Sequence, residues 1–182
     1  MNKIPNKCYI VANMPKEISD WVISLRQKVD PALLHMPVEI TLSGSSGVGT
    51  LIEGQNFDRI KNLLVDSFAN TLPFEFSFRG ITTFPKTEIY YLDPDPDIFR
   101  SMHAKLAESD LEFKESPFPY SPHCSVAGFT PITDETRAII RAADSPKGKH
   151  TVSSISIYRN EKMNPVELWR YEPKKLPKPG SS

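Results

Sequence analysis

Apolar residues recur every three or four positions in four segments of the chain, a spacing typical of helices with one buried side. The clearest stripe lies in residues 18–29, where Ile18, Val22, Leu25 and Val29 fall on one face. The same spacing predicts further helices over residues 56–70, 98–109 and 134–143.

A two-residue alternation of apolar and polar side chains marks the strands, because one face of such a strand is buried and the other is exposed. It is clearest at Phe74, Phe76 and Phe78, which alternate with polar residues. Strands of this or a shorter apolar type are predicted at 7–13, 38–44, 73–85, 87–92, 122–128, 151–159 and 167–173.

The order of these elements indicates an internal duplication, since each half of the chain contains a helix followed by a pair of strands. We therefore expect an α+β fold with two pseudo-symmetric αβ lobes, in which two antiparallel sheets line a central groove and the helices lie outside. Residues 1–175 would form this single domain, and residues 176–182, the end of the Pro- and Lys-rich stretch 174–182, a flexible tail.

One short pattern occurs twice. VEITLSG (38–44) and PHCSVAG (122–128) both place a Glu or His at the second position, a Thr or Ser at the fourth and Gly at the seventh. Residues two apart in a strand share a face, so Glu39 would point with Thr41. The apolar residues between them would point into the core.

If the two strands face each other across the groove, four polar side chains converge: Glu39, Thr41, His123 and Ser125. Two titratable groups flanking a site can act as general base and general acid at a phosphorus or carbonyl centre. Two hydroxyls can donate hydrogen bonds to the non-bridging oxygens of a substrate. We expect no cofactor and no metal, because this chemistry requires none and the sequence has no metal-binding motif.

The composition of the chain limits the class of ligand and the cellular compartment that we expect. Lys and Arg together number 22, as do Asp and Glu, and this balance favours a small ligand or a nucleic-acid end over a long duplex. Cys8 and Cys124 lie in apolar runs and are predicted to be buried free thiols. No apolar run is long enough for a membrane span or a signal peptide, so we expect a cytoplasmic location. We also expect a monomer that binds no membrane.

The chain resembles the 2H phosphoesterases, the superfamily of 2′-5′ RNA ligases and RNA 2′,3′-cyclic phosphodiesterases. KCYIVANMPKEI, PFEFSFRGITTFP and FPYSPHCSVAGF carry the resemblance, which covers nearly the whole sequence. It implies a bilobal fold with two H-x-[T/S] motifs on facing strands. It also implies catalysis by His123 and phosphate contact by Ser125.

The sequence departs from this family at Glu39, where the resemblance leads us to expect histidine. A carboxylate could act as the general base, with His123 as the acid. Alternatively, the anionic substrate could raise the pKa of Glu39, so that a protonated Glu39 acts as the acid and His123 as the base. Strongly reduced activity, or binding without turnover, are the other two outcomes that the sequence leaves open.

Several neighbouring side chains are candidates for weaker roles. Tyr9 and Tyr120 are substrate-binding candidates, and these two rings and Phe84 could stack on a base or pack in the core. His103 is expected at a surface or half-buried helix position, and His150 in a solvated loop. The glycine-rich residues 43–50 lack the Lys of a phosphate-binding loop and are predicted to form a flexible loop.

Three functions remain open from the sequence. The first is a metal-independent phosphoesterase acting on a 2′,3′-cyclic or 2′-5′-linked nucleotide or RNA terminus, with His123 and Glu39 as the acid/base pair. The alternative is a catalytically impaired protein of the same fold that binds a nucleotide or a related small ligand. The third is an esterase-like or other enzyme that uses the groove for a different substrate.

Overall fold

The structure is a computed structural model that describes residues 2–162 and 164–174. The tail predicted at residues 176–182 lies outside the described residues. Four α-helices and one short 3-10 helix alternate with eleven strands in the described chain. The helices are α1 (Lys16–Val29), η1 (Pro31–Leu33), α2 (Phe57–Phe68), α3 (Pro96–Ala107) and α4 (Asp134–Ala142).

The larger sheet has six strands, in the order β11-β10-β1-β3-β7, and β2 also pairs with β1. Its members are β1 (Cys8–Asn13), β2 (Glu39–Ser43), β3 (Thr50–Leu51), β7 (Phe113–Lys114), β10 (Ile155–Glu161) and β11 (Asn164–Tyr171). All of these pairs are antiparallel. The centre of the sheet is β1, where Ile10, Val11 and Ala12 are fully buried.

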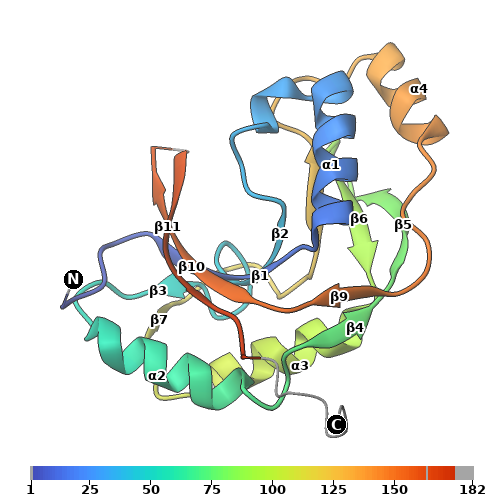
Figure 1. Ribbon diagram of the computed structural model, residues 1–182. Coiled ribbons are helices and arrows are strands. Elements are labelled where there is room, and N and C mark those ends of the chain that lie inside the picture. Colours follow the sequence, from blue (N-terminus) through green and yellow to red (C-terminus); the bar gives the residue numbers. More distant parts are fainter. Residues whose placement is uncertain (1, 163, 175–182) are drawn as a thin grey trace, which may run out of the picture.

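The second lobe contains a three-stranded antiparallel sheet in the order β5-β6-β8 and the strand pair β4-β9. These strands are β4 (Phe74–Phe76), β5 (Phe78–Thr83), β6 (Tyr90–Pro94), β8 (Cys124–Ala127) and β9 (His150–Val152). In Figure 1, β4 and β9 lie between the larger sheet and the β5-β6-β8 sheet.

Two helices, α1 and α3, connect the lobes by packing on a strand of the opposite half. The α1 helix lies between β1 and β2 in sequence, yet it packs against β8 and α4, whereas α3 packs against α2 and β2. Figure 1 accordingly shows α1 and α4 on one side of the molecule and α2 and α3 along another. The α+β fold with antiparallel sheets and outer helices agrees with the sequence prediction. No described helix is long and apolar enough to cross a membrane.

Local signals explain where the helices begin. The side chain of Asn56 accepts a hydrogen bond from the backbone N–H of Arg59 (2.9 Å) and caps α2. Thr133 caps α4 in the same way through the N–H of Thr136 (3.1 Å). In both helices the cap satisfies a backbone donor that the first turn leaves free.

His150 is the clearest error of the sequence prediction. The sequence predicts a solvated loop, but the residue lies in β9 and is only 8% exposed. Its ring packs against Phe76 and Phe78, with ring centroids 5.9 Å away in both cases, and its Nδ1 lies 3.6 Å from Glu17. The polar neighbours of His150 in sequence hide this position, because pairing of β9 with β4 is a long-range contact.

Candidate active site

The four polar side chains of the repeated motif line one cleft of about 340 Å³. Glu39 and Thr41 come from β2, Ser125 comes from β8, and His123 directly precedes β8. The strands β2 and β8 lie side by side, and the thiol of Cys124 contacts the backbone of Glu39. The two matching segments are therefore opposite parts of a single site.

The alternation along each strand sends the neighbouring side chains into the core. Ile40 and Leu42 on β2 are fully buried, as are Cys124 and Val126 on β8. Because side chains alternate between faces, burying these four residues turns the polar ones toward the cleft. Both cysteines of the chain are buried free thiols, as predicted.

Glu39 is a half-buried carboxyl in the wall of the cleft. Burial raises its pKa from about 4.5 to about 7, although a hydrogen bond from Thr41 and the charge of Arg26 act in the opposite direction. The Thr41 hydroxyl donates to both carboxylate oxygens, at 3.0 and 3.1 Å. Near pH 7 a substantial fraction of Glu39 is consequently protonated and able to donate a proton.

The surroundings of His123 lower its pKa, whereas those of Glu39 raise the pKa of the carboxyl. Its Nδ1 lies 2.8 Å from the carbonyl oxygen of Ser121, and in the neutral ring that nitrogen donates while Nε2 accepts. The rings of Phe84 and Tyr91 pack edge-on against it, with centroids 4.9 and 5.7 Å away. Burial lowers the pKa of His123 below its usual value, so the imidazole is neutral near pH 7.

Together these environments separate the two roles. A carboxyl with a raised pKa is suited to give a proton, and a neutral imidazole with a free nitrogen is suited to accept one. Of the two assignments that the sequence leaves open, the geometry and charge of the cleft favour Glu39 as the acid and His123 as the base.

Arg26 is a residue that the sequence analysis did not select, although it holds both motif segments. This α1 side chain is only 2% exposed. Its Nη2 donates to the carbonyl oxygen of Ser125 (2.8 Å), and its Nη1 donates to those of Met36 (2.8 Å) and Leu33 (3.2 Å). One guanidinium thus ties β8 to the segment that leads into β2.

Replacing Arg26 with Met is expected to lower the free energy of unfolding by about 2–4 kcal/mol, because buried carbonyls lose their donors. Urea denaturation followed by circular dichroism measures this change. Arg59→Met, at an exposed position, is the matched control and should change stability by less than about 0.5 kcal/mol. An equally small effect of Arg26→Met would show that the guanidinium does not hold the two segments.

Asp30, at the C-terminal end of α1, fixes the turn that follows β8. Its fully buried carboxylate accepts hydrogen bonds from the backbone N–H groups of Gly128 (2.8 Å) and Phe129 (2.7 Å). It also accepts one from the Thr130 hydroxyl (3.0 Å). Arg26 therefore holds the motif segment at Ser125, and Asp30 holds the turn that follows it.

The two tyrosine candidates take different positions. Tyr9 lines the cleft, its ring stacks on Tyr158 at 5.8 Å, and its buried hydroxyl has no hydrogen-bond partner among the described residues. Tyr120 lies behind Thr41: its hydroxyl donates to the carbonyl oxygen of that residue (3.1 Å). Its ring also stacks on His103 at 3.9 Å, which leaves Tyr9 as the tyrosine directly facing the cleft.

The glycine-rich segment after β2 forms one wall of the cleft through Gly44, Ser45 and Thr50. A Cβ atom at Gly44 would lie 2.7 Å from the methyl carbon of Thr41, so this position requires glycine. Further along, the N–H of Gly47 donates to the carbonyl oxygen of Phe118 (2.8 Å). This backbone bond ties the segment to a distant part of the chain.

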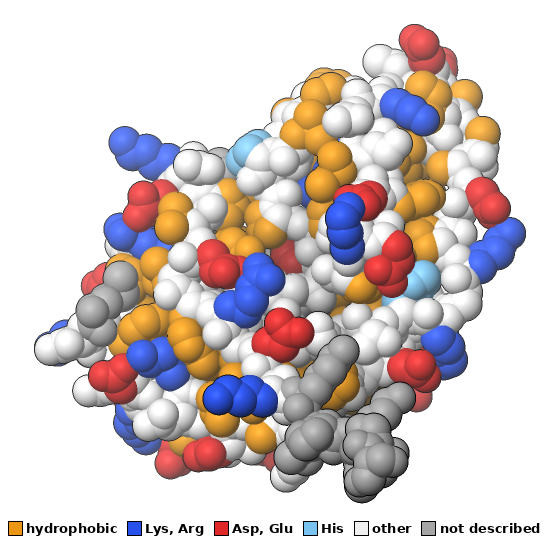
Figure 2. Space-filling model, in the orientation of Figure 1, with side chains coloured by type: hydrophobic (Ala, Val, Ile, Leu, Met, Phe, Trp, Pro, Cys, Tyr) orange, Lys and Arg blue, Asp and Glu red, His pale blue; other side chains and the backbone are white. Residues whose placement is uncertain are grey.

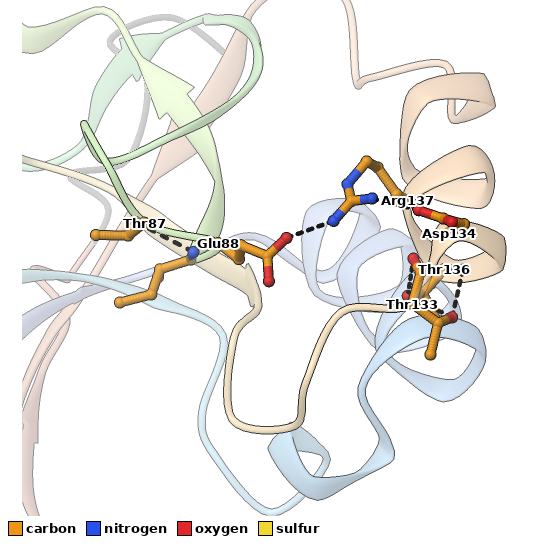
Figure 3. Close-up of polar contacts among 7 residues, drawn as sticks. Thr87, Glu88, Thr133, Asp134, Thr136 and Arg137 are labelled. Carbon is orange, nitrogen blue, oxygen red and sulfur yellow. Dashed lines mark hydrogen bonds and ion pairs between the residues drawn. The ribbon is translucent and has the colours of Figure 1, made fainter.

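Phe84, whose ring packs against His123, lies in the turn between β5 and β6, and an ion pair joins this turn to α4. Arg137 reaches from α4 to Glu88 in the β5–β6 connection, and it also pairs with Asp134 at 2.6 Å (Figure 3). The Thr87 hydroxyl donates to the carbonyl oxygen of Phe84 (3.0 Å) and closes the turn. These contacts support the aromatic wall beside the imidazole.

Within residues 2–162 and 164–174, no three His, Cys, Asp or Glu side chains lie close enough together to hold a metal ion.

The comparisons with known proteins agree with the class that the two lobes and the facing motifs define, the 2H phosphoesterases. The model of the 2′-5′ RNA ligase superfamily matches residues 14–164, and the chain belongs to this superfamily. Membership supports a phosphoesterase or ligase-type function in nucleotide processing. No curated protein matches the chain in sequence.

Solved structures share the fold at low sequence identity. Escherichia coli LigT in complex with 3′-AMP is 17% identical, with a TM-score of 0.56 over 94% of this chain and 100% of that one. The protein TT0787 of Thermus thermophilus is 16% identical, with a TM-score of 0.56 over 91% and 96%. LigT has also been solved with ATP, and that structure is 15% identical to the chain with a TM-score of 0.55 over 94% and 99%.

Proposed function

We propose that the protein is a phosphoesterase that opens 2′,3′-cyclic phosphates or cleaves 2′-5′ linkages at a nucleotide or RNA terminus, without a metal. The observation that carries the proposal is the single cleft lined by Glu39, Thr41, His123 and Ser125. The nucleotides bound to LigT in its solved structures support a ligand of this kind. The buried free thiols favour a reducing, cytoplasmic location.

Hydrolysis of a cyclic phosphate uses each group once. His123 Nε2 takes a proton from water as the water oxygen bonds to phosphorus, and the bond from phosphorus to one ribose oxygen breaks. Glu39 gives its proton to that leaving oxygen. The product is a phosphomonoester with a free ribose hydroxyl, and the proton on His123 returns to Glu39 through solvent.

The hydroxyl groups bind the phosphate during this step. Ser125 donates to a non-bridging oxygen, where negative charge grows. Thr41 donates to Glu39 in the structure, but a protonated carboxyl needs this hydrogen bond less than a carboxylate does. The Thr41 hydroxyl can then turn to the phosphate.

The proposal is tested by incubating the wild-type protein with a 2′,3′-cyclic mononucleotide, an oligoribonucleotide ending in a 2′,3′-cyclic phosphate and a 2′-5′-linked dinucleotide, each with and without EDTA. We expect hydrolysis of one phosphate ester bond in at least one of these substrates, at a rate that EDTA does not change. Saturable binding of all three without turnover would contradict the proposal and identify a binding protein. Turnover abolished by EDTA would contradict its metal-independent form.

A further inference from the structure

A second hollow of about 370 Å³ adjoins the cleft and is rich in basic side chains. It lies where the segment before β1 meets the β10–β11 hairpin, and Lys7, Arg159 and Lys162 are in its lining. Figure 2 shows Lys and Arg side chains projecting at the edge of the molecule where Figure 1 places the tip of this hairpin. We call this second hollow, whose lining also includes Asn160, the basic hollow.

The basic hollow and the cleft are continuous, because Lys7 and Asn160 line both of them. The two parts of the chain are also joined directly: the backbone N–H of Asn160 donates to the carbonyl oxygen of Lys7 (3.1 Å). A ligand with its reacting phosphate between Glu39 and His123 can therefore extend past Lys7 into the basic hollow.

Positive charge prevails in this hollow despite the zero net charge of the chain. Its acidic member, Glu161, is engaged by Arg159, with Nη1 and Oε1 2.6 Å apart. Within the described residues no ion pair joins Lys7 or Lys162 to a carboxylate, and both side chains are exposed. Two lysines thus remain available for an anion.

The backbone gives an independent reason to regard these lysines as functional. Among the described residues, the non-glycine residues with positive φ are all lysines, and two of the three, Lys7 (φ 57°) and Lys162 (φ 50°), line the hollow. Gly or Asn adopts this conformation at less cost. A lysine in it sacrifices local stability, which points to a use for the charge.

We propose that the basic hollow binds a second phosphate of the ligand, separate from the phosphate that reacts. The inference rests on the proposed function for the position of the first phosphate. The second phosphate has two possible sources: the next diester of an RNA strand, or a terminal phosphate on a mononucleotide. A lysine ammonium recognises either as a point charge.

The test uses Lys7→Gln combined with Lys162→Gln, which removes two charges and keeps polar side chains of similar length. The substrates are a 2′,3′-cyclic mononucleotide, the same mononucleotide with a 5′-phosphate, and a short oligoribonucleotide ending in the cyclic phosphate. Lys28→Gln, on an exposed position of α1, is the matched control for loss of a lysine.

Because Lys7 also lines the cleft, some loss on every substrate is expected, but we expect the double variant to lower kcat/KM for the oligoribonucleotide about tenfold more than for the plain cyclic mononucleotide. If the second phosphate is the next diester of an RNA strand, the 5′-phosphorylated mononucleotide should show little of this additional loss. If it is a terminal phosphate, the 5′-phosphorylated mononucleotide and the oligoribonucleotide should show the same loss. Equal losses on all three substrates, or no loss on any, would overturn the proposal.

Binding separates this inference from the proposed function. If no substrate turns over, the proposed function fails, but anisotropy of a labelled oligoribonucleotide still reports on the basic hollow. The double variant should then weaken binding about tenfold. It should also reduce the salt dependence of binding, by roughly one unit of log Kd per log of salt for each phosphate that the lysines no longer neutralise. Unchanged affinity and salt dependence would overturn the inference on its own.

Discussion

His123→Ala is expected to lower kcat/KM for a 2′,3′-cyclic phosphate by about 10²–10⁴-fold, which is the range for loss of one general acid or base. The two rings that pack against the imidazole, Phe84 and Tyr91, supply no base in its place. The variant should still bind ligand, since Thr41 and Ser125 remain in place. A steady-state assay combined with a binding measurement separates the two effects.

His35→Ala is the control for this prediction. His35 is exposed and lies four residues before Glu39 on the segment leading into β2. Its replacement should leave kcat/KM within about twofold. A loss in His35→Ala that equals the loss in His123→Ala would place the base elsewhere.

Glu39→Gln should reduce kcat/KM by a similar factor of about 10²–10⁴, because an amide cannot give a proton to the leaving ribose oxygen. The amide oxygen can still accept the hydrogen bond from Thr41, so the fold of the cleft should persist. Glu39→His restores a titratable group and should recover part of the loss. Glu53→Gln, at an exposed carboxylate, is the matched control and should leave the rate unchanged.

Stability gives a second readout of Glu39 that is independent of turnover. The pKa of this carboxyl is about 7 in the folded protein, above its ordinary value of 4.5, so its contribution to stability is complete below pH 4.5 and is lost as the pH rises through 7. The stability that the wild-type protein loses between pH 5 and pH 8 should therefore be about 1–2 kcal/mol smaller in Glu39→Gln. The full pKa shift would correspond to a larger difference, but the cleft is open to water, which screens the group. Identical pH dependence in both proteins would contradict the raised pKa.

The sequence predicts the motif strands well because their signal is local. Burial of Ile40 and Cys124 forces the neighbours of each toward the opposite face, and this holds whatever the rest of the fold does. That the two strands face each other is a long-range property of the fold. It is predictable because the pattern occurs twice and because the chain resembles a known family. The pKa shifts of Glu39 and His123 depend on how deeply each group is enclosed, so the sequence leaves their roles open.

Other features lack a usable local signal. The strands β3 and β7 have two residues each, too few for a period to be detected. Arg26 could have been found, because it stands four residues after Val22 and three before Val29 and so interrupts the apolar stripe of α1. A charged residue within such a stripe is a candidate for a buried hydrogen-bonding role.

The pH dependence of kcat/KM in wild type and in Glu39→Gln is the most direct test of the proposed chemistry. With His123 as base and Glu39 as acid, the wild-type rate rises through a pKa below 6.5, falls through a pKa near 7, and is highest between them. Glu39→Gln should keep the rising limb and lose the falling one. Loss of the rising limb instead, or a profile that the substitution leaves unchanged, would contradict Glu39 as the proton donor.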